Sequence, residues 1–183
     1  MPAATLDKVN RVNSGCDNEQ SVRSDWESWL AEHAPKLLLF ARQQTRSEAD
    51  AQDVVQDAVL ECWHRQTVGT PPAPGLVFAT IRRRAIDLGR STDRRAGREL
   101  AVASEAAEIW FDGGVEEREQ SRLIQEAMNK LPDNYREVVT LKVWGGLTFV
   151  EIASVLDIPA NTAASRYRYG LAELRRHTID ILK

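Results

Sequence analysis

The strongest constraint on the fold is a segment near the C-terminal end of the chain, which has the pattern of two helices joined by a tight turn. Thr148 and Glu151 have the T-x-x-E spacing of a capping box at the start of the first helix. Asp157 stands where the turn needs a left-handed backbone, which aspartate tolerates better than most residues. Pro159 then predicts the start of a second helix, which we expect to reach about Arg176. The segment is therefore predicted to be a helix-turn-helix.

The second helix of this motif has two distinct faces. Four residues at helical spacing are expected to face the core, namely Ala163, Tyr167, Gly170 and Leu174. The outward residues can donate and accept hydrogen bonds, as a helix in a DNA major groove must. We take as candidate DNA-binding residues Asn161, Thr162, Ser165, Arg166, Arg168 and Tyr169. A helical hairpin with a solvated polar face is the alternative, and the capping box and the small Ala160 and Ala164 weigh against it.

The remainder of the chain also has helical periodicity, because apolar residues recur at three- and four-residue steps and no segment alternates like a strand. This pattern predicts an all-α fold with two small helical domains joined by an acidic linker. The expected divisions are a polar tail over 1–24, a first domain over 25–95, a linker over 96–120 and a second domain over 121–183. In the first domain, Pro35 is expected to kink a helix or to start a new one. Phe78 is expected in the core, with base stacking as the alternative.

Charge is distributed unevenly along the chain. The net charge of −3 hides a block over 61–100 that has eight arginines and four acidic residues, and a following block over 99–120 that has seven acidic residues and one arginine. Arg83, Asp87, Arg90 and Arg94 share one helical face, and Arg82 lies beside it. Because this is the one concentrated cationic surface, we expect it to hold nucleic-acid phosphates. Asp87 is expected either to touch DNA or to orient the arginines.

An acidic stripe precedes the arginine block. Asp53, Asp57 and Glu61 are spaced four residues apart on a predicted helix, with Gln56 beside them. A solvated face explains such a stripe in most helices. A contact surface for basic and polar groups of a partner protein is the other interpretation, and it would set the register and rate of association more than the affinity.

Two sets of motifs stand in a fixed order along the chain. The C-terminal set comprises LPDNYREVV at 131–139, GLTF at 146–149, EIA at 151–153, Ile158-Pro159, Thr162 and Ser165-Arg166. The N-terminal set comprises DAQDVVQD at 50–57, Trp63, and the segment 81–90 around Ala85-Ile86-Asp87. Together they resemble the extracytoplasmic-function sigma factors of bacterial RNA polymerase, over roughly residues 25–95 and 121–177.

The resemblance implies a role and a set of partners. It implies that Asp53, Gln56, Asp57 and Glu61 bind core RNA polymerase, and that Arg82, Arg83, Asp87, Arg90 and Arg94 contact the minus-ten promoter element. It implies that the helix-turn-helix binds the minus-thirty-five element and that an anti-sigma factor is a further partner. The chain departs from the family's usual pattern at Arg83, where asparagine is common, at Ala164, where a basic residue is common, and at Asp157, where glycine is common.

Other classes of protein fit the sequence less well. An enzyme needs a convergent set of acids, bases or ligands, and we expect none, and no metal or cofactor, since no nucleophile motif, phosphate loop or metal-ligand spacing is present. No run approaches the roughly 20 apolar residues that span a bilayer, which predicts a cytoplasmic protein without membrane insertion. A repressor would explain the helix-turn-helix alone. A sigma mimic that sequesters an anti-sigma factor is the remaining alternative; the arginine face argues against it and Ala164 for it.

Overall fold

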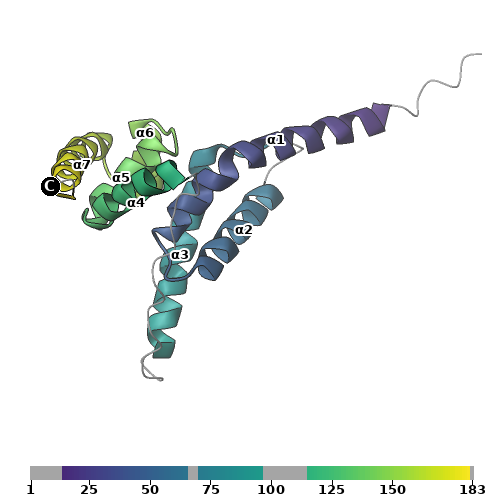
Figure 1. The fold of residues 1–183 in the computed structure, drawn as a ribbon. Coiled ribbons are helices and arrows are strands. Elements are labelled where there is room, and N and C mark those ends of the chain that lie inside the picture. Colours follow the sequence, from purple (N-terminus) through teal and green to yellow (C-terminus); the bar gives the residue numbers. More distant parts are fainter. Residues whose placement is uncertain (1–13, 66–69, 97–114, 182–183) are drawn as a thin grey trace, which may run out of the picture.

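The computed structural model describes the backbone of residues 14–65, 70–96 and 115–181 and the side chains of 25–65, 70–91 and 121–179. All regular structure in these ranges is α-helical, which confirms the predicted fold class (Figure 1). The helices are α1 (Ser14–Arg42), α2 (Glu48–Arg65), α3 (Pro74–Ala96), α4 (Val115–Asn129), α5 (Asp133–Val143), α6 (Phe149–Leu156) and α7 (Ala160–Ile181). Most of the expected linker falls outside the described residues. No helix in the described part of the chain is both long and apolar enough to cross a membrane.

Helices α1, α2 and α3 pack around aromatic and aliphatic side chains. Phe40 and Phe78 are both buried, and their rings meet edge to face with centroids 5.5 Å apart. Phe78 is thus a core residue, as expected. Ser47 caps α2, because its hydroxyl accepts a hydrogen bond from the backbone N–H of Asp50 at 3.1 Å. The alternative that Pro35 starts a new helix is wrong: α1 continues through it, since the buried side chains that follow hold the helix in place despite the missing backbone donor.

The helix-turn-helix has the local geometry that the sequence predicts. The Thr148 side chain accepts from the backbone N–H of Glu151, and the Glu151 carboxylate accepts from the backbone N–H of Thr148 at 2.7 Å, so the capping box is complete. Helix α6 ends at Leu156, and its C-cap is Asp157, whose φ of 56° is left-handed. Helix α7 extends to Ile181, five residues further than expected. Helix α6 is therefore capped by local interactions at both of its ends.

Close packing sets the position of α7 on α5. Gly170 is buried, and a Cβ atom placed there would lie 2.9 Å from Cγ2 of Val139 and 3.3 Å from Cβ of Tyr135. Arg136 fixes the turn before α5, because its guanidinium donates to the backbone carbonyls of Met128 at 3.1 Å and Leu131 at 2.8 Å. The α4–α5 turn and the α5–α7 contact thus bring the start of α5 beside the middle of α7.

The two groups of helices share a single hydrophobic core. Buried side chains of α1, α2 and α3 pack in one cluster with buried side chains of α5, α6 and α7. Polar contacts join the two groups at the edge of this core: Arg82 donates from Nε to Oε1 of Glu137 at 3.2 Å, and the Thr140 hydroxyl donates to Oε1 of Gln43 at 2.8 Å. In Figure 1, α5 and α6 lie against the end of the α1–α3 group. The described halves of the chain therefore pack directly on each other.

Candidate nucleic-acid interface

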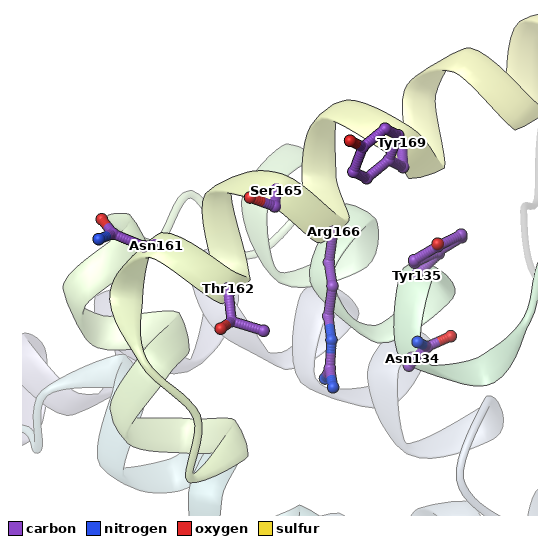
Figure 2. Close-up of a pocket in the computed structure, with 7 residues that line it drawn as sticks. All are labelled: Asn134, Tyr135, Asn161, Thr162, Ser165, Arg166 and Tyr169. Atoms are coloured by element: carbon purple, nitrogen blue, oxygen red, sulfur yellow. The ribbon is translucent and has the colours of Figure 1, made fainter.

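The outer face of α7 borders a groove of about 360 Å³ (Figure 2). Five of the six candidate DNA-binding residues of this helix line it, namely Asn161, Thr162, Ser165, Arg166 and Tyr169. Asn134 and Tyr135, from the start of α5, form the opposite wall. Reasoning from the sequence missed these two residues, because only the close α5–α7 contact at Gly170 brings them to the groove.

Arg166 is the cation of this groove. Figure 2 shows its side chain reaching away from α7 between Thr162 and the two α5 residues. The side chain is half-buried, and no acid in the described part of the chain pairs with its guanidinium. Such a group keeps its donors for an external acceptor, and phosphates and guanine edges are acceptors with matching geometry.

Arg168 lies outside the groove and is tied to its neighbour. Its guanidinium donates to the Tyr169 hydroxyl at 3.2 Å and lies 4.9 Å from the centre of that ring. Both side chains are exposed. The cation–π contact holds Tyr169 at the upper edge of the groove and leaves the other donors of Arg168 free to face a ligand.

The candidate arginines of α3 differ in their surroundings. Arg82 is turned toward α5 and pairs with Glu137, and the two side chains are 29% and 13% exposed. Arg83 is 52% exposed, and Arg90 is 74% exposed with Asp87 at 3.9 Å from its guanidinium. The side chain of Arg94 falls outside the described residues. The structure therefore places Arg83, Asp87 and Arg90 on an open face of α3 and directs Arg82 to the junction with α5.

The acidic residues of α2 also divide into two groups. Asp53 and Gln56 are exposed. Asp57 is 61% exposed and contacts Arg84 at 2.7 Å. Glu61 is only 16% exposed. The carboxylate of Glu61 is surrounded by the guanidinium groups of Arg65, Arg83 and Arg84.

Glu61 is the centre of this charge cluster, which we define as Asp57, Glu61, Arg65, Arg83 and Arg84. Its Oε1 contacts Arg83 at 2.5 Å and Arg65 at 2.7 Å, and its Oε2 contacts Arg84 at 2.8 Å. The hydrogen bond from Arg83 is the main cause that lowers the pKa of Glu61 below 4.5, and the same bond raises the pKa of Arg83. Both groups are therefore held in their charged forms.

The outward face of α2 combines polar and apolar residues. Asp53, Gln56, Leu60 and Trp63 follow one another at helical spacing and are all exposed, with Leu60 and Trp63 each 47% exposed. The Trp63 ring lies on the buried Trp26 ring, with centroids 4.2 Å apart. Exposed apolar groups next to polar ones are typical of a protein-binding surface. Trp63 belongs to the N-terminal motif set, whereas Leu60 was not singled out from the sequence, although it lies off the buried stripe of this helix.

Comparison with known proteins gives consistent matches to both halves of the chain. The family described as Sigma-70 region 2 matches residues 29–95, and the family described as Sigma-70, region 4 matches residues 121–174. The ECF RNA polymerase sigma factor SigL of Mycobacterium tuberculosis is 31% identical over 147 residues, which cover 79% of this chain and 83% of the relative. The ECF RNA polymerase sigma factor RpoE of Cereibacter sphaeroides is 26% identical and covers 87% of this chain and 98% of the relative.

A solved structure shares the fold. It is the sigma factor RpoE in complex with the anti-sigma factor NepR from Bartonella quintana, and its match has a TM-score of 0.65 at 20% identity. The match covers 84% of this chain and 96% of that one. The arrangement of helices is thus similar over most of both chains.

Proposed function

This chain belongs to the ECF sigma factors of bacterial RNA polymerase, and we propose which of its surfaces bind the polymerase and which bind the two promoter elements. As a sigma factor it binds core RNA polymerase and directs promoter recognition and DNA melting. The observation that carries the assignment is the presence of two separate cationic, hydrogen-bonding faces, one on α3 and one on α7. We assign residues 25–95 to polymerase and minus-ten binding, 96–120 to a linker and 121–183 to minus-thirty-five binding.

The outward face of α2 is the proposed polymerase-binding surface. Trp63 and Leu60 supply apolar area that loses contact with water on binding, and Trp63 is already fixed by its contact with Trp26. Asp53 and Gln56 lie on the same face and supply charge and hydrogen bonds at its rim. A surface with this pattern fits a partner helix that carries apolar side chains at one end and basic ones at the other.

The open face of α3 is the proposed minus-ten contact. Arg83 and Arg90 expose their guanidinium groups and would bind phosphates of the promoter and of the strand that becomes unpaired. Arg82 joins them only when the α3–α5 junction opens, since Glu137 holds it in the described packing. The buried Phe78 is not available to stack a base in this arrangement.

The groove between α7 and α5 is the proposed minus-thirty-five contact. Ser165 and Asn161 present small hydrogen-bonding groups to base edges, and Arg166 offers a cation without a protein partner in the described residues. Because Ala164 stands where the resemblance leads one to expect a basic residue, we expect a shallow dependence of binding on salt at this element.

The family and the solved structure extend the proposal to location and partners. A sigma factor works where polymerase and DNA are, so we place this protein in the cytoplasm. The structural relative was solved with an anti-sigma factor bound, which favours an anti-sigma partner for this chain. The role consists of binding and requires no reaction catalysed by the chain itself.

Transcription in vitro tests the proposal. The protein is added to sigma-free bacterial core polymerase with a library of genomic promoters, and the RNA starts are sequenced. We expect specific starts that share two separated upstream motifs, and we expect Arg83→Ala and Ser165→Ala to change the preference at the nearer and the farther motif respectively. Stable binding to core polymerase without any specific start would refute the promoter assignment and favour a protein that sequesters an anti-sigma factor.

A further inference from the structure

We propose that Glu61 is a positioning residue, which together with its partner Arg84 holds Arg83 in orientation for the minus-ten element, and that it is not itself a polymerase contact. The inference rests on the proposed function of the α3 face. It concerns a residue that the sequence pattern groups with the polymerase-binding acids of α2. The structure separates Glu61 from those acids by its surroundings.

The first observation is that the Glu61 carboxylate is enclosed by arginine side chains. The Glu61 side chain is 16% exposed, whereas the side chain of Asp57, one turn earlier, is 61% exposed. Both carboxylate oxygens of Glu61 are occupied: Oε1 by Arg83 and Arg65, and Oε2 by Arg84. A partner protein could reach this carboxylate only by displacing arginines, so Glu61 is poorly placed for a polymerase contact.

The second observation is the way in which Arg83 and Arg84 are bonded to the acids of α2. Arg83 uses one terminal nitrogen, Nη2, for Glu61 and still exposes 52% of its side chain. Arg84 spans the two acids of the cluster, with Nη1 on Asp57 at 2.7 Å and Nε on Glu61 at 3.0 Å. A guanidinium group held at one edge by a carboxylate presents its remaining donors in a fixed direction. Arg83 therefore leaves α3 with its orientation set by α2, and Arg84, whose three nitrogens all face Glu61 and Asp57, ties α3 to α2 beside it.

This arrangement changes the cost of binding DNA. A free surface arginine loses rotamer freedom when it grips a phosphate or a base, and prior fixation removes that part of the cost. The charge cluster contains three arginines and two acids, so a positive charge remains to attract DNA after the internal pairs are counted. Glu61 would thus contribute to the selectivity of the α3 face more than to its total attraction for nucleic acid.

The cluster also connects two binding surfaces. Asp53, Gln56 and Trp63 face outward on α2, while Glu61 faces α3 from the same helix. A shift of α2 when polymerase binds would be transmitted to Arg83 and Arg84 through this carboxylate. The positioning role therefore means that a residue of the polymerase-binding helix sets the orientation of Arg83.

The test uses Glu61→Gln, which preserves the shape of the side chain and removes its charge. Holoenzyme is assembled with full-length protein, and two affinities are measured: that for core polymerase, and that for fork-junction DNA taken from a promoter found in the transcription assay. Discrimination is the ratio of affinities for this DNA and for the same DNA with a scrambled minus-ten element. Glu126→Gln is the matched control, because Glu126 also pairs with an arginine one turn away, Arg122, at 3.2 Å on α4.

We expect Glu61→Gln to lower discrimination by about threefold to tenfold, because Arg83 loses its orientation. Binding to scrambled DNA should stay equal or become tighter, because the cluster gains net positive charge. Affinity for core polymerase and the thermal midpoint should follow the Glu126→Gln control. Glu61→Asp, which keeps the charge, should retain more discrimination than Glu61→Gln, and in an Arg83→Ala, Arg84→Ala background Glu61→Gln should have no further effect.

Three results would overturn the inference. Loss of affinity for core polymerase with unchanged discrimination would make Glu61 a polymerase contact. Equal loss of binding to promoter and scrambled DNA together with a lower thermal midpoint, not rescued by aspartate, would give it a structural role only. An undiminished effect in the background without the two arginines would show that Glu61 acts by another route. Failure of the proposed function is distinguishable, because the unaltered protein would then show no discrimination at all.

Discussion

The ion pair between Arg82 and Glu137 joins the two halves of the molecule, and Glu137→Gln tests how much it contributes. Arg82 Nε lies 3.2 Å from Oε1 of Glu137, and the two side chains are 29% and 13% exposed. Coulomb's law with an effective dielectric constant of about 20 gives a gross attraction of about 5 kcal/mol at this separation. Desolvation and lost side-chain freedom offset most of it, and exposed pairs contribute only about 0–1 kcal/mol.

Because this pair is partly buried, we expect it to stabilise the closed form, in which the two groups of helices pack on each other, by about 1–2 kcal/mol. A difference of about 1.4 kcal/mol corresponds to a tenfold change in an equilibrium constant. The amide that replaces the carboxylate keeps the shape and leaves Arg82 with a weaker acceptor. The ratio of closed to open molecules should therefore fall by about tenfold in the variant.

Fluorescence energy transfer between the two halves measures this ratio. Dyes are placed at Gln52→Cys on α2 and Arg175→Cys on α7, which are both exposed, after Cys16 is replaced by serine. Glu126→Gln is again the control for loss of a carboxylate. We expect a lower mean transfer efficiency in Glu137→Gln and the same change in Arg82→Gln. If Glu137→Gln and Arg82→Gln both show the same transfer efficiency as the Glu126→Gln control, the conclusion that this ion pair holds the halves together is refuted.

Four further outcomes follow from local geometry. Asp157→Gly should increase the free energy of unfolding by about 0.5–1 kcal/mol, because glycine carries no steric penalty at a φ of 56°. In a urea titration the midpoint should rise, and the slope of the free energy against urea concentration should not change. Gly170→Ala should lower stability by about 1–3 kcal/mol and weaken binding to a minus-thirty-five duplex, whereas Gly89→Ala, with open space around its Cβ, should be neutral or stabilising. Trp63→Ala should weaken binding to core polymerase by about tenfold or more in a titration with labelled protein. Glu151→Gln should lower the free energy of unfolding in denaturant by about 0.5–1 kcal/mol at pH 7. The hydrogen bonds from Thr148 lower the pKa of the Glu151 carboxyl below 4.5 in the folded protein. The difference in stability between the unaltered protein and the variant should therefore be fully present above pH 4.5 and vanish as the pH falls through the folded-state pKa.

The parts of the fold that depend on local signals were predictable from the sequence. The capping box, the left-handed turn residue and the periodic apolar faces each lie within a few residues of one another, so the first helix and the turn of the helix-turn-helix could be placed almost to the residue. Pro35 shows the limit of such signals. Its ring and missing donor disfavour a helix interior locally, yet α1 continues because packing of the following turns outweighs that cost.

The composition of the binding surfaces was less predictable, because it depends on contacts between helices. Spacing alone placed Glu61 in one stripe with Asp53 and Asp57, and only the position of α3 shows that its carboxylate is enclosed by arginines. Spacing likewise gave no reason to place Asn134 beside α7. Asn134 comes close to α7 because Gly170 has no side chain and lets α5 approach. The sequence places Gly170 on the inner face of its helix but does not show which helix packs against it.

These contacts bear on how recognition of polymerase and of DNA can be combined in a small protein. Arginines lie at three of the helix junctions: Arg82 joins α3 to α5, Arg83 and Arg84 join α3 to α2, and Arg136 joins α4 to α5. An internal acid satisfies an arginine while the protein is free, and phosphate replaces or shares that acid when DNA arrives. Arg82 has one acid on the other half of the molecule and must lose it, whereas Arg83 has its acid on the same half and can keep it. We therefore expect opening of the halves to release Arg82 for DNA and to leave the orientation of Arg83 unchanged.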